Sequence, residues 1–79
     1  MLNDPAQAID ESRRLDQSSE ECQNIIGELE GIIDELPTYW EGVSANVFIQ
    51  NNRQVIERLK RIKEEMHQIS LEINTLATS

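Results

Sequence analysis

The residues that could do chemistry are few, and their spacing does not bring them together. Cys22 is the only cysteine and His67 the only histidine among 79 residues. No hydroxyl or thiol stands at a helical or loop spacing that would place a base beside it, and no glycine-rich loop is suited to phosphate. The sequence pattern places the fifteen carboxylates on helix faces that we expect to be exposed to solvent. We therefore expect no enzymatic activity, no catalytic residues and no cofactor.

Metal and thiol chemistry are equally poorly supported. One histidine leaves any metal site to depend mostly on carboxylates, so we predict no metal site. One cysteine cannot form an internal disulfide. Cys22 lies among isoleucines and leucines, which favours a small core residue over a reactive thiol.

The composition limits the partners of the chain. The net charge is −8, so the chain should be repelled by nucleic acid and by anionic membrane surfaces. No apolar run reaches the roughly 18 residues that would span a membrane, so we expect no membrane insertion. The N-terminal segment 1–5 lacks the pattern of a cleavable signal peptide. We expect a single domain over 1–79. A chain of this length buries little apolar surface, so we expect a partner chain to contribute to its stability.

A short bend contains all three large aromatic side chains. Tyr39, Trp40 and Phe48 lie in or just after a segment from Pro37 to Gly42. Proline cannot continue a helix, and glycine can adopt backbone angles that other residues resist. We predict a turn over about 37–43, with Trp40 as a hydrophobic plug at that end.

The segment of about 5–36 has the pattern of an amphipathic helix. Asp4 can cap it, Pro5 suits its first position, and Gln7 can complete a capping box. Apolar or small residues recur in steps of four and three, as in a heptad seam. The seam residues are Ala8, Ser12, Leu15, Ser19, Cys22, Ile26, Leu29, Ile33 and Leu36. Its N-terminal half holds small and polar residues, so we expect looser packing there.

The segment of about 44–76 repeats this pattern and predicts an antiparallel hairpin in which Cys22 faces Ile62. The expected second seam is Phe48, Asn52, Val55, Leu59, Ile62, Met66, Ile69, Ile73 and Leu76. Asn52 would either fix the register or lie half exposed. Four isoleucines then flank the seams and would be exposed in a single hairpin, namely Ile25, Ile32, Ile49 and Ile56.

The fold class predicted from these patterns is all-α. Burying an isoleucine is worth roughly 1.5–3 kcal/mol, so the four flanking isoleucines favour dimerisation. Two hairpins would make a four-helix bundle. The first 42 residues carry a charge of −9 and the remainder +1, which favours an acidic helix beside a basic one, within or between chains.

The bend resembles a known family. Trp40-Glu41-Gly42 between two amphipathic helices, followed by Ser44 and Phe48, resembles the WXG-motif proteins of bacterial type VII secretion, the early secreted antigenic target-like small helical proteins. The resemblance implies a turn and export motif at Trp40, Gly42, Ser44 and Phe48. It also implies pairing of the hairpin with itself or a related hairpin, and export from the cytoplasm without a cleavable signal peptide.

Several alternatives remain open at this point. Family members often carry a Tyr-x-x-x-Asp/Glu export signal after the second helix, whereas the only tyrosine here is Tyr39. That signal would belong to a missing tail or to a partner, such as the helical domain of a larger secreted effector. The chain could instead be an intracellular coiled-coil adaptor or a helical fragment of a larger protein.

Overall fold

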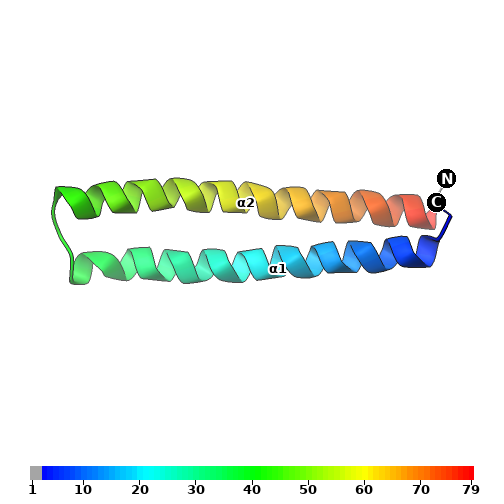
Figure 1. Cartoon of the computed structure of the whole chain (residues 1–79), viewed down its shortest axis with the longest axis horizontal. Helices are drawn as coiled ribbons and strands as arrows, with labels where there is room; N and C mark the ends of the chain where they lie inside the picture. The colour runs from blue at the N-terminus through cyan, green and yellow to red at the C-terminus, as the bar shows by residue number, and fades with distance from the viewer. Residues whose placement is uncertain (1–2) are drawn as a thin grey trace.

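Two long antiparallel helices, joined by a tight bend, form a hairpin in the computed structural model (Figure 1). The structure describes residues 3–79, so residues 1 and 2 of the N-terminal segment discussed above lie outside it. Helix α1 runs over Pro5–Glu35, a short 3₁₀ turn η1 over Leu36–Thr38, and helix α2 over Val43–Thr78. The rod measures 57 × 15 × 12 Å. Residues 3–79 contain no β-strand.

The start of α1 has the expected N-cap at Asp4 and the expected proline at its first position. The Gln7 N–H donates to Asp4 Oδ1 at 3.1 Å, and Pro5 occupies the first helical position, where its missing N–H leaves no bond unmade. The helix then continues for 31 residues without an internal proline. It gives way to the 3₁₀ turn at Leu36, which still has helical backbone angles, because the next residue, Pro37, has no N–H to continue the helical hydrogen bonds.

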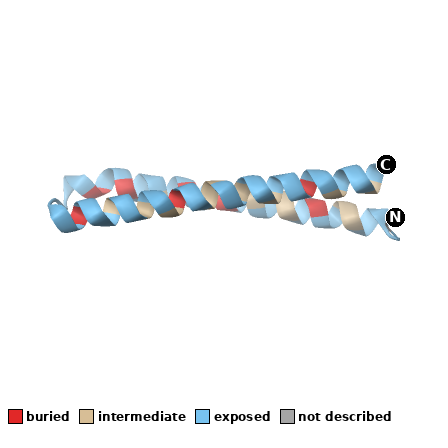
Figure 2. Cartoon of the chain, turned by 90° about the horizontal axis from the view of Figure 1, so that it is seen from above, coloured by how far each residue is buried: buried red, intermediate tan, exposed pale blue. Residues whose placement is uncertain are grey.

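The inward face of α1 confirms the expected seam. Ser12, Cys22, Ile26, Ile33 and Leu36 are buried, and the other four seam residues are half-buried. In Figure 2 the buried residues lie where the two ribbons meet, while most of both helices is exposed. A single hairpin therefore covers only a narrow strip of each helix.

The inward face of α2 differs from the expectation. Of the nine expected seam positions, Asn52, Leu59, Met66 and Ile73 do lie toward α1, but the alternate positions are shifted by one residue. Ile56, expected outside the seam, is only 4% exposed and belongs to the core cluster with Cys22, Ile26 and Ile33. The inward row is Ala45, Ile49, Asn52, Ile56, Leu59, Lys63, Met66, Ser70, Ile73 and Ala77.

Small side chains explain this shift. Ser70 and Ser12 are both buried, and Ser70 Oγ donates to the Ser12 carbonyl oxygen at 2.9 Å. Ser19 Oγ donates to the Lys63 carbonyl at 3.2 Å, so hydroxyl groups on one helix reach the backbone of the other. Such contacts need closely spaced helix backbones, which bulkier residues at these positions would prevent. The N-terminal half of α1 is thus joined to α2 by small residues, and of its seam residues only Ser12 is buried, whereas the core cluster lies farther along the helix.

The register of the hairpin shifts accordingly. The Cys22 thiol lies 3.5 Å from the carbonyl oxygen of Leu59 and not opposite Ile62. Cys22 is a buried core residue, as expected. Asn52 is half-buried, and its Nδ2 donates to the Phe48 carbonyl of its own helix at 2.8 Å. It therefore makes no polar contact across the hairpin that would set the register.

The burial of Ile56 predicts a large effect on stability. Ile56→Ala should lower the free energy of unfolding by about 2–5 kcal/mol, because it leaves a cavity in the core cluster. Val43→Ala removes methyl groups from an exposed side chain and should change it by about 0.5 kcal/mol or less. Urea unfolding at one fixed protein concentration measures both. Equal stability of the two variants would contradict the observed seam.

Candidate functional site

The backbone of the bend is held by a short set of hydrogen bonds. The N–H groups of Tyr39 and Trp40 both donate to the Leu36 carbonyl, at 3.2 and 2.9 Å. Thr38 Oγ1 donates to the Glu35 carbonyl at 2.6 Å. These contacts satisfy carbonyls at the end of α1 that have no helical partner. The chain therefore leaves α1 in a defined direction and presents Trp40 at a fixed point.

Gly42 starts the second helix in a conformation that requires glycine. Its φ is 112° and its ψ −174°, and its carbonyl accepts from the Asn46 N–H at 3.0 Å. This region of backbone space is almost restricted to glycine, because a Cβ would clash with the adjacent backbone. Gly42 is the only residue in the described chain with positive φ. The glycine of the Trp-x-Gly motif thus allows the sharp entry into α2.

Trp40 packs on Phe48 across the start of α2. The two ring centroids are 5.5 Å apart, with 54° between the planes, a tilted arrangement that aromatic pairs favour. Trp40 is 38% and Phe48 41% exposed. Ser44 is also exposed, in the first turn of α2. The four motif residues therefore lie together near the bend, with the aromatic pair accessible.

Leu36 and Ala45 are buried at the end of the hairpin next to the bend, and the small alanine lets the two helices approach directly after the bend. Trp40 lies at the same end, where it packs on Phe48 and is 38% exposed. The role of Trp40 as a plug that closes this end stays a prediction.

One side of the hairpin is apolar and open, and we call it the side face. In α2 every seventh residue from position 48 lies just before an inward residue, and all five are apolar. On α1 the apolar residues of this side are Ile25 and Ile32, which directly precede the buried Ile26 and Ile33. The side face consists of Ile25, Ile32, Phe48, Val55, Ile62, Ile69 and Leu76, of which Val55 is half-buried and the rest exposed.

The opposite side is closed by polar contacts between the helices. Lys63 Nζ donates to Gln23 Oε1 at 2.7 Å. Asp34 lies 3.9 Å from Arg53, and Asp16 lies 3.4 Å from His67. The Asp34–Arg53 and Asp16–His67 groups are well solvated, so these two pairs contribute little to stability, whereas Lys63 is half-buried. These contacts make the two sides of the hairpin chemically different. Only the apolar side face is suited to a contact with a partner that excludes water.

The four isoleucines expected at a dimer interface do not lie on one common surface in the structure. Ile25 and Ile32 are about half exposed on the side face, Ile49 is half-buried, and Ile56 is in the core. Conversely, Ile62, Ile69 and Leu76 were assigned to the core from the sequence and lie on the side face. The sequence does contain two apolar rows one residue apart in α2, but apolar character alone does not say which row faces α1.

A comparison with protein families bears directly on the Trp-x-Gly bend. The family model described as proteins of 100 residues with WXG matches residues 3–79. The chain belongs to the WXG100 family. This confirms the resemblance seen at Trp40-Glu41-Gly42 and associates the hairpin with type VII secretion. No curated protein and no solved structure matched the chain.

Within residues 3–79, no three His, Cys, Asp or Glu side chains are grouped so that they could hold a metal ion. Neither described helix contains an apolar stretch sufficient to cross a bilayer. The features available for recognition are the aromatic pair at the bend and the side face beside it.

The glycines of the hairpin predict opposite effects of one substitution. Gly42→Ala should destabilise the fold by about 1–3 kcal/mol, because φ is positive there. Gly31→Ala should stabilise it by about 0.5–1 kcal/mol, since Gly31 is helical and its added Cβ meets nothing within 4 Å. Thermal unfolding of the two variants, followed by circular dichroism, measures both changes. Equal shifts of the same sign would be inconsistent with the conformation of Gly42.

Proposed function

We propose that this protein is a non-enzymatic substrate or co-exported partner of a type VII secretion system, and that it acts by pairing with a second helical hairpin. The partner is another copy of the chain or a related hairpin, including the helical domain of a larger secreted effector. The observation that carries the proposal is the apolar side face, which ends at Trp40 and Phe48 in a chain of the WXG100 family. The same family membership supports the further proposal that the protein is exported from the cytoplasm without a cleaved signal peptide.

The exposed area of the chain supports pairing. The hairpin exposes 5987 Å², whereas a compact monomer of 9.1 kDa exposes about 4,900 Å². The difference, roughly 1,100 Å², is comparable with the 800 Å² or so that each partner contributes to a specific interface. A second hairpin laid along the side face would complete a four-helix bundle.

The interface we propose differs from the one expected from the sequence. It retains Ile25 and Ile32 on α1 and has Ile49 at its margin. On α2 it uses the exposed apolar row from Phe48 to Leu76 in place of Ile56, which is buried against α1. Aliphatic residues on both helices, spaced along most of the rod, suit contact with other helices better than contact with a small ligand.

A charge on the side face should separate the hairpins. Ile62→Glu places a carboxylate in the proposed interface, where its desolvation is unfavourable. We expect this variant to sediment as a single 9.1 kDa chain, whereas the unmodified protein, in the assembly isolated from its native host, sediments with the added mass of its partner. Leu71→Glu is the matched control, because Leu71 is 46% exposed against 47% for Ile62 but points away from the side face. Dissociation by both variants, or by neither, would count against the proposed interface.

Trp40 should be needed for export more than for folding. Trp40→Ala removes an aromatic contact worth about 0.5–1.5 kcal/mol beyond area burial and leaves the core cluster intact. We expect the variant to accumulate folded in cells and to be absent from the medium, as the unmodified protein is when the secretion ATPase is deleted. Tyr39→Ala, at an exposed neighbouring aromatic, is the control and should be exported.

The outcomes of this export experiment separate the alternatives. Normal export of Trp40→Ala would remove Trp40 from the export signal. Failure of the unmodified protein to leave the cell, in a strain that exports other WXG-type substrates, would favour the intracellular coiled-coil adaptor. Circular dichroism of the purified variants verifies that both remain helical.

A further inference from the structure

A second surface lies on the outside of α2, away from both α1 and the side face. We call it the outer face and define it by exposed residues that follow one another in steps of four and three. They are Val43, Val47, Gln50, Gln54, Glu57 and Arg61. From Val43 to Arg61 the helix rises about 27 Å. The outer face would remain accessible when a second hairpin covers the side face.

The end of the outer face near the bend is apolar. Val43 is 81% exposed and Val47 53%. Both line an open groove of about 360 Å³ together with the amide side chains of Asn46, Gln50 and Asn51. Two neighbouring valines at this level of exposure, with amides around them, suit a contact that covers an apolar side chain of a partner.

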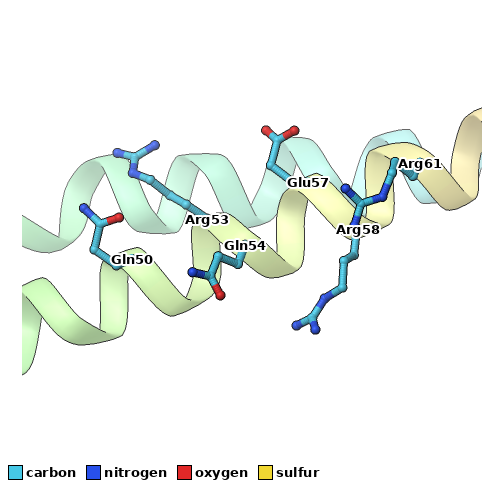
Figure 3. A pocket seen from close by; sticks show the side chains of 6 residues that line it. All are labelled: Gln50, Arg53, Gln54, Glu57, Arg58 and Arg61. Carbon is cyan, nitrogen blue, oxygen red and sulfur yellow. The ribbon is translucent and has the colours of Figure 1, made fainter.

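The other end of the outer face is cationic. A groove of about 420 Å³ continues from Gln50 and is lined by Gln50, Arg53, Gln54, Glu57, Arg58 and Arg61. Figure 3 shows these side chains projecting from successive turns of α2, with Arg53 and Glu57 along one edge and Gln54 and Arg58 along the other. Within residues 3–79, Arg58 and Arg61 form no ion pair, and Arg53 has only the 3.9 Å contact with Asp34.

The local charge here is opposite to that of the chain. The net charge is −8, yet the groove lining holds three arginines and one acidic residue, Glu57, which lies 3.7 Å from Lys60. Guanidinium groups bind carboxylates through paired hydrogen bonds, and the neighbouring glutamine amides add further donors. At physiological ionic strength the Debye length is about 8 Å, so these arginines, and not the carboxylates farther along the rod, set the field that a docked group experiences.

We propose that the outer face of α2 binds an acidic amphipathic helix of a different protein. The apolar residues of that helix cover Val43 and Val47, and its carboxylates, about three to four turns further along, pair with Arg58 and Arg61. This contact is separate from the pairing of hairpins through the side face. It would allow a paired hairpin to hold a third component, and it does not depend on the secretion role.

Other occupants fit the outer face less well. The outward positions of α1 in a second copy carry carboxylates but no large apolar residue to cover the valines. A nucleic acid or an anionic membrane presents a long array of negative charge, which the acidic α1 alongside would repel. A short acidic helix places its charge only where the arginines are.

Photo-cross-linking in the native host tests the proposal. A photoreactive amino acid replaces Gln54 in the middle of the outer face, or Gln68 farther along the same side of α2 as the control. We expect Gln54 to cross-link to one segment of another protein, identified by mass spectrometry as a helix with apolar residues at one end and Asp or Glu toward the other. Gln68 should give a much lower yield of that product.

Arginine variants show whether the contact depends on charge. Arg58→Gln with Arg61→Gln should reduce the Gln54 cross-link several-fold. Arg13→Gln with Arg14→Gln makes the same change of charge on exposed positions of α1 and should leave the yield unchanged. The proposal is overturned by a cross-link to a second copy of this chain, by one to lipid or to a segment without acidic residues, by equal yields from Gln54 and Gln68, or by equal effects of the two arginine pairs.

Discussion

Two helices can cover only one strip of each other, and α2 has two apolar strips. One contains Ile49, Ile56, Leu59, Met66 and Ile73 and faces α1. The other runs from Phe48 to Leu76 and cannot reach α1 at the same time, because residues one position apart on a helix point about 100° apart. The hairpin therefore leaves an apolar side face that needs a second partner to be removed from water.

Which strip faces inward is decided by closeness of approach and not by apolar content. Ser12, Ser70 and Ala45 let the helix backbones come near each other, and the hydroxyl groups bond to the opposite backbone. Ile69 and Leu76 are thereby left on the outside, while the smaller Ser70 and Ala77 face α1. The bend continues this arrangement, since Gly42 turns the chain so that Trp40 packs on Phe48 at the end of the side face.

The sequence was sufficient for the architecture because the decisive signals are local. Helix ends are marked by the backbone chemistry of Asp4, Pro5, Pro37 and Gly42. On α1 a single apolar row runs the length of the helix, so its inward face is identified from the sequence. The orientation of α2 about its axis is predicted wrongly from the sequence, because the row from Phe48 to Leu76 is the more apolar one and yet Ile56, outside it, faces α1. Periodicity identifies rows, but choosing between Ile56 and Ile62 requires the facing residues of α1 and a register. The outer face was missed because single valines and arginines on a helix surface look like ordinary solvated positions.

Hydroxyl-radical footprinting of the assembly isolated from the native host tests the central claim most directly. In the lone hairpin Ile62 and Leu71 are exposed to nearly the same extent, 47% and 46%. Each side chain's oxidation is measured relative to the unfolded chain. If a second hairpin covers the side face, Ile62 will be protected several-fold more than Leu71, approaching the protection of Ile56. Equal oxidation of Ile62 and Leu71 would show that the side face stays open to water and would contradict the account.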